Sequence, residues 1–140
     1  ASMRRLIDDA GLAAHVEIDS AGTGAWHVGE APDSRARAAG KRRGLQVVGR
    51  ARKVVIEDFE RFDYMIAMDL SNRSDLERLA PNDEFARKIA LLRSFDSSSP
   101  ADAEVPDPYY GGGDGFERVL DICEAGCRGL LEHIRKRHGL

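Results

Sequence analysis

The stretch Tyr64-Met65-Ile66-Ala67-Met68 is a nearly continuous apolar run, and it decides the fold class of this chain. A run of this length without alternating polar residues is typical of a strand that is buried on both faces in a parallel sheet. Helical spacing follows through Leu76 and Leu79, and Ser71 is expected to cap that helix at its N-terminus. The sequence therefore predicts a buried strand that is followed at once by a helix.

The same change from a strand-like to a helical pattern recurs along the 140 residues. Short strand-like pieces are expected at residues 16–19, 54–56 and 89–92, and helices at residues 3–10, 57–60 and 115–137. A further helix is expected to run from a cap at Asp33 or Ser34 to Gly44. Strands that alternate with helices predict an α/β fold, in which a parallel sheet is flanked by helices in three layers. Because no linker or repeat divides the chain, residues 1–140 are expected to form a single domain.

Composition and charge narrow the classes of function. A hydrophobic content of 42% and a charged content of 32% fit an ordinary globular protein. The net charge of −3 argues against nucleic acid or a membrane surface as a partner, because neither would attract this chain electrostatically. No apolar run approaches membrane-spanning length.

The spacing of cysteines and histidines predicts neither a disulfide nor a metal site. Cys123 and Cys127 are four residues apart in a helical pattern, which is poor geometry for a disulfide. The four histidines show no ligand spacing with these cysteines. We therefore expect a cytoplasmic protein without a metal or other cofactor, whose two cysteines pack as small apolar side chains.

The second informative stretch is residues 105–113 (VPDPYYGGG), which hold an acid between two prolines. Because proline fixes its own φ and restricts the residue before it, Asp107 is expected on a stiff, extended loop. A carboxyl group beside Tyr109 and Tyr110 suits a general acid that protonates an aromatic leaving group. A proline-rich surface turn is the alternative interpretation of the same residues.

Three loops are expected at the carboxyl ends of the predicted strands, where open α/β sheets bind ligands. Ser20 follows one strand, Asp69 follows another, and the loop of Asp107 follows the last. We expect these loops to converge on one cleft. For Asp69 we favour a helix-capping carboxylate over a residue of the active site.

Taken together, the chain resembles the bacterial type of low-molecular-weight protein tyrosine phosphatase over essentially all of its 140 residues. The resemblance depends on the order and spacing of several short motifs, each of which is weak alone. These are residues 19–24 (DSAGTG), 26–29 (WHVG), 51–52 (AR), 58–63 (DFERFD), 67–69 (AMD), 91–96 (LLRSFD), 107–111 (DPYYG) and 116–117 (FE).

The resemblance implies a reaction mechanism. In this family a cysteine thiolate in a Cys-x5-Arg loop attacks phosphotyrosine and forms a phosphocysteine intermediate, which water then hydrolyses. Asp107 matches the general acid that protonates the departing phenolate and later acts as a base toward the water. The implied partners are a phosphotyrosine-containing protein as substrate and phosphate or another oxyanion as ligand.

The resemblance also assigns residues to the substrate pocket. Tyr109 and Tyr110 match the aromatic wall that grips the phosphotyrosyl ring. Trp26 and His27 match the variable loop at the rim of the pocket, which influences the choice of substrate. Ser20 matches a residue that supports the phosphate-binding loop by hydrogen bonding.

One part of the family pattern is missing from the chain. The 140 residues contain no Cys-x5-Arg, because Cys123 and Arg128 are separated by four residues and lie in a predicted helix. We expect the nucleophile, with the first strand of the sheet, upstream of Ala1, and we expect the 140 residues alone to be inactive. A homodimer is one way in which such a truncated domain could cover its open sheet edge. Gly49 stands where family members often have a histidine, which affects the network around Ser20.

Two other functions remain open. The first is an inactive, truncated or phosphatase-like module that binds a partner or regulates it without turnover. The second is arsenate reductase, which shares the fold but needs additional redox cysteines. The aromatic loop after Asp107, together with Trp26, favours an aryl phosphate over a small oxyanion as the substrate.

Overall fold

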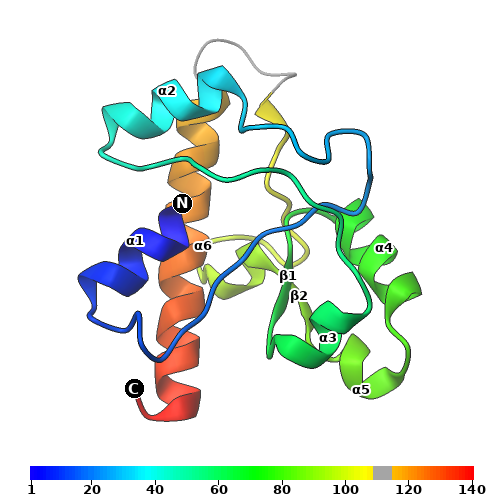
Figure 1. The fold of residues 1–140 in the computed structure, drawn as a ribbon. Coiled ribbons are helices and arrows are strands. Elements are labelled where there is room, and N and C mark those ends of the chain that lie inside the picture. Colours follow the sequence, from blue (N-terminus) through cyan, green and yellow to red (C-terminus); the bar gives the residue numbers. More distant parts are fainter. Residues whose placement is uncertain (109–114) are drawn as a thin grey trace.

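The computed structural model describes residues 1–108 and 115–140 (Figure 1). Two short strands lie at its centre, β1 (Met65–Ala67) and β2 (Ile89–Leu91). The helices are α1 (Ser2–Asp9), α2 (Ser34–Arg42), α3 (Glu57–Arg61), α4 (Leu70–Leu79), α5 (Asp83–Ala86), the 3-10 helix η1 (Leu92–Phe95) and α6 (Gly115–His138). None of the helices among the described residues is long and apolar enough to cross a membrane.

The two strands form a parallel pair, as the sequence predicts. Met65 lies opposite Ile89 and Ala67 lies opposite Leu91, and the crossover between the two strands contains α4 and α5. Two further predicted strands, at residues 16–19 and 54–56, do not form ladders in the described part of the chain. Near them, the structure contains an isolated parallel bridge between Gly22 and Lys53. The prediction of a strand at residues 16–19 is wrong for this structure because that segment borders a large cavity instead of a neighbouring strand.

Helices cover both faces of the strand pair (Figure 1). On one side, α1 and α6 enclose an apolar core that includes Met3, Ile7 and Leu130. On the other side, Phe59 of α3 is fully buried in a second core with Leu76 of α4. The predicted α/β architecture, a parallel sheet between helices, is confirmed in this form.

Side-chain caps explain where three helices begin. Asp33, one of the two expected caps, accepts a hydrogen bond from the Arg35 N–H at the start of α2. For α4 the expected cap at Ser71 is wrong, since Asp69 accepts from the Asn72 N–H at 2.7 Å and the helix begins at Leu70. Asn82 caps the short α5 in the same way. The cap position favours a polar side chain that reaches an unpaired helical N–H, and Asp69 meets that requirement two residues earlier than Ser71.

The closest packing between elements joins α6 to η1. A Cβ atom at Gly126 would lie 2.7 Å from Leu92 Cγ, and one at Gly129 would overlap the carbonyl oxygen of Phe95. The long C-terminal helix can therefore approach η1 only because these positions lack a side chain.

The Gly129→Ala substitution tests this close approach. Helix propensity alone would make alanine more stable than glycine by about 1 kcal/mol. The overlap with the Phe95 backbone should reverse the sign, so that the free energy of unfolding falls by about 2 kcal/mol in urea denaturation. Gly22→Ala is the control, because a Cβ there meets its nearest atom at an ordinary 3.8 Å. A Gly129→Ala protein more stable than the parent would contradict the packing described here.

Candidate active site

A cavity of about 820 Å³ lies between α1, α6, β1 and the segment of residues 15–23. Its walls are mostly apolar and include Ile18, Ile66, Leu92 and Ile134. Packed protein interiors rarely contain voids larger than a water molecule. A space of this size beside an edge of a parallel sheet is therefore suited to receive a further polypeptide segment or a ligand.

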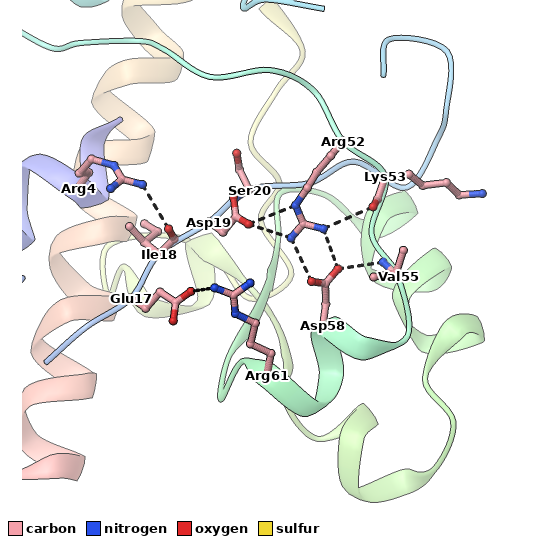
Figure 2. A network of polar contacts seen from close by, with 10 residues as sticks. All are labelled: Arg4, Glu17, Ile18, Asp19, Ser20, Arg52, Lys53, Val55, Asp58 and Arg61. Carbon is pink, nitrogen blue, oxygen red and sulfur yellow. Dashed lines mark hydrogen bonds and ion pairs between the residues drawn. The ribbon is translucent and has the colours of Figure 1, made fainter. Parts of the chain in front are cut away.

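Ser20 lines this cavity, at the end of the segment that was predicted as a strand. Its neighbour Asp19 is held by Arg52, whose Nε and Nη2 lie 3.2 and 3.1 Å from Asp19 Oδ2. The same guanidinium binds Asp58 of α3 through two hydrogen bonds of 3.0 and 3.1 Å. Figure 2 shows how Arg52 joins the segment of Ser20 to α3.

The Arg52–Asp58 pair is structural. The two side-chain hydrogen bonds from Arg52 lower the pKa of Asp58, and a bond from the Val55 N–H acts in the same direction. In return, hydrogen bonding to Asp58 raises the pKa of Arg52. Both groups stay charged at neutral pH, so neither is suited to transfer a proton. Sequence reasoning missed this pair as a cluster, although both residues lie in motifs that carry the family resemblance.

The cysteines contribute to the apolar wall of the cavity. Cys123 and Cys127 both line it, and Cys127 is buried. Burial, with a smaller effect of Cys123, raises the pKa of the Cys127 thiol to about 11. Burial likewise raises the pKa of Cys123. Because the thiolate is the nucleophilic form, these cysteines match the predicted packing role and are unsuited to attack phosphorus.

Asp107 is exposed and does not line the cavity. Two residues before it, the Val105 N–H donates a hydrogen bond of 2.8 Å to the carbonyl of Met68, which does line the cavity. Tyr109 and Tyr110, the predicted aromatic wall, lie outside the described residues. Of the loops expected to converge, those of Ser20 and Met68–Asp69 meet at the cavity region, while Asp69 itself caps α4, as favoured from the sequence.

Trp26 and His27 lie in an exposed loop. The loop is tied to residues 51–54 by backbone hydrogen bonds, among them Gly29 N–H to Ala51 O at 2.7 Å. The Trp26 side chain is 85% exposed, and its ring lies against Gly24, where a Cβ atom would overlap it. His27 Nδ1 is 2.7 Å from Glu30 Oε2. Neither predicted rim residue lines the cavity, so their role as a rim stays a prediction.

The departure at Gly49 has a backbone explanation. Gly49 has a φ of +108°, a conformation that side chains other than glycine rarely adopt. A histidine at this position would therefore need a different local backbone.

The described residues contain no group of three or more His, Cys, Asp or Glu side chains placed to hold a metal ion.

Asp58→Asn tests the ion pair by its pH dependence. The pKa of Asp58 is lower in the folded than in the unfolded protein, so its stabilising contribution is present above about pH 4 and is lost as the pH falls further. We expect Asp58→Asn to lower the free energy of unfolding by about 2 kcal/mol at pH 7, with a smaller difference at pH 3. Asp8→Asn on α1 is the control and should show no such difference. An Asp58→Asn effect that is constant between pH 7 and pH 3 would contradict the pairing.

Comparisons with known proteins were made over the whole chain. The family model of low molecular weight phosphotyrosine protein phosphatases matches residues 1–139. A low molecular weight protein-tyrosine-phosphatase of Streptomyces coelicolor is 44% identical over 138 residues, which cover 98% of this chain and 84% of the relative. The human low molecular weight phosphotyrosine protein phosphatase is 38% identical, with coverage of 94% and 83%.

Comparison with solved structures leads to the same kind of enzyme as the sequence comparisons. A protein tyrosine phosphatase of Entamoeba histolytica with Hepes in its active site is similar at a TM-score of 0.90, with 42% identity and coverage of 99% of this chain and 86% of that one. A Drosophila arginine phosphatase has a TM-score of 0.87 and 32% identity, with coverage of 96% and 87%. The chain therefore belongs to the low molecular weight phosphotyrosine protein phosphatase family, and the enzyme class predicted from its sequence is confirmed.

Proposed function

We propose that Asp107 is the general acid of a phosphotyrosine hydrolysis that proceeds through a phosphocysteine intermediate. The observation that carries this assignment is the hydrogen bond between Val105 and Met68. It fixes the segment before Asp107 to the wall of the cavity at the carboxyl end of β1, where α/β folds bind their ligands. The exposed carboxyl group of Asp107 follows two residues later, and in this proposal it acts on a substrate bound at that edge.

The chemistry needs a proton donor in its first step. The thiolate attacks phosphorus, the bond from phosphorus to the phenolic oxygen breaks, and Asp107 gives its proton to the departing phenolate. Because tyrosine has a pKa of about 10, its phenolate leaves slowly without such a proton. In the second step water attacks the phosphocysteine, the Asp107 carboxylate takes a proton from it, and inorganic phosphate and the thiolate are released.

The nucleophile in this proposal comes from a Cys-x5-Arg loop upstream of Ala1. Two observations support it: the 140 residues contain no such motif, and burial keeps Cys123 and Cys127 in the thiol form. The cavity beside β1 offers room for the strand that would lead into this loop. There the loop would lie next to Ser20, whose proposed role is to support it by hydrogen bonding.

The substrate side of the pocket is assigned to aromatic residues. Trp26 offers an exposed ring to a phosphotyrosyl group, with His27 beside it, and Tyr109 and Tyr110 are proposed as the aromatic wall. This set favours an aryl phosphate on a protein substrate, and phosphate or another oxyanion as a competing ligand. Because Cys123 and Cys127 are free thiols, we place the reaction in the reducing cytoplasm.

Asp107→Asn, made in the protein that includes the upstream loop, tests the general acid. Asparagine keeps the size of the side chain but has no acidic proton to transfer, so kcat/KM for phenyl phosphate should fall by about 100-fold. Binding of vanadate, which needs no leaving-group proton, should stay within about threefold when measured by competitive inhibition. Turnover of phenyl phosphate that survives within severalfold would show that Asp107 is not the acid.

The isolated residues 1–140 provide a separate test of the nucleophile. They should show no detectable hydrolysis of p-nitrophenyl phosphate, because burial raises the pKa of both cysteine thiols, of which Cys127 is buried and Cys123 half-buried. A longer protein with the upstream Cys-x5-Arg should show vanadate-sensitive turnover, which its Cys→Ser variant should lose. Vanadate-sensitive activity of residues 1–140 alone would mean that the nucleophile lies within them.

A further inference from the structure

Four contacts fasten the segment that leads into Asp107. Arg73 Nη1 lies 3.1 Å from Asp102 Oδ1, and Arg93 Nη1 donates to the carbonyl of Glu104 at 2.8 Å. The other two contacts are the backbone bond from Val105 to Met68 and a bond of 2.9 Å from the Leu70 N–H to the carboxylate of Glu104.

Most of these partners belong to one short stretch of chain. Met68, Leu70 and Arg73 all lie where β1 passes into α4, so the segment is fixed to the carboxyl end of the central strand. In Figure 1 it rises from the end of β1 and β2 toward the N-terminal end of α6.

The side chain of Glu104 makes an unusual contact among these four. Leu70 is the first residue of α4, and its N–H is one of the helix-terminal donors without an intrahelical acceptor. Asp69 satisfies the Asn72 N–H, and Glu104 satisfies the Leu70 N–H from 34 residues away. A carboxylate at this end of a helix also interacts favourably with the helix dipole. Glu104 therefore serves as a second cap of α4, donated by another segment.

The backbone between Glu104 and Asp107 is stiff, so fixing Glu104 also restricts where Asp107 can lie. Pro106 has a fixed φ, and the residue that precedes a proline is restricted to extended conformations, as is Val105 here. Only Val105 and Pro106 stand between Glu104 and Asp107 in the chain. A hold on Glu104 and Val105 thus limits the directions in which the carboxyl group of Asp107 can point.

From this geometry we propose that Glu104 is a positioning residue, which orients the general acid Asp107 by anchoring its loop to the first turn of α4. The proposal rests on the proposed function of Asp107. Loss of the anchor leaves the proton donor present but poorly aligned, and alignment decides how far a donor accelerates the departure of a phenolate.

The experiment measures kcat/KM, which includes the departure of the phenolate but not the later hydrolysis of the phosphocysteine. Two substrates are compared in the protein that includes the upstream loop. Phenyl phosphate has a strongly basic leaving group and needs the acid, whereas 2,4-dinitrophenyl phosphate has a weakly basic one and does not. Glu104→Ala should lower kcat/KM about 10-fold for phenyl phosphate and less than about twofold for the dinitrophenyl ester.

Two matched variants separate positioning from general damage. Glu104→Gln keeps an oxygen that can accept from the Leu70 N–H, so most of the activity toward phenyl phosphate should return. Glu132→Ala, which removes an exposed glutamate paired with Lys136 on α6, should leave both substrates unchanged.

A double variant shows whether Glu104 acts through Asp107. In the Asp107→Asn background, Glu104→Ala should cause no further loss, because there is no donor left to orient. If Glu104→Ala adds its full factor there, or lowers kcat/KM equally for both esters, Glu104 is not a positioning residue for the acid. If Asp107→Asn itself lowers both esters equally, the proposed function fails first and the role of Glu104 falls with it.

Discussion

The passage from β1 into α4 is the constraint on which the rest of the candidate site depends. The parallel pairing of β1 with β2 fixes the end of β1, and Asp69 then starts α4 without an intervening loop. Backbone groups at this junction hold the segment before Asp107, and Met68 faces the cavity. One short stretch therefore holds the start of a helix, a cavity wall and the approach to the proposed acid.

Much of this arrangement could be predicted from the sequence, because the strongest patterns are local. The apolar run at residues 64–68 and the long helix from Gly115 depend on burial and periodicity that neighbouring residues carry. The short α5 and the 3-10 helix η1 were missed. Four-residue elements have little periodic signal, and η1 in particular is held by its packing against α6.

The parts of the site that were missed depend on contacts between distant residues. Arg52 meets Asp19 across 33 positions, and Glu104 meets Leu70 across 34, so no local spacing reveals either contact. At residues 16–19 the reverse occurs, because a local pattern predicts a strand that the structure does not form. Its alternating pattern fits a strand, but a ladder also needs a neighbour, and the described residues place a cavity there.

The exposed position of Trp26 has a practical consequence for spectroscopy. It is the single tryptophan of the chain, and with 85% of its surface in contact with solvent its indole is already in an aqueous environment. Unfolding of the two apolar cores therefore changes the surroundings of this fluorophore very little. Its emission therefore reports on the loop of residues 22–30 and is a poor probe of global denaturation.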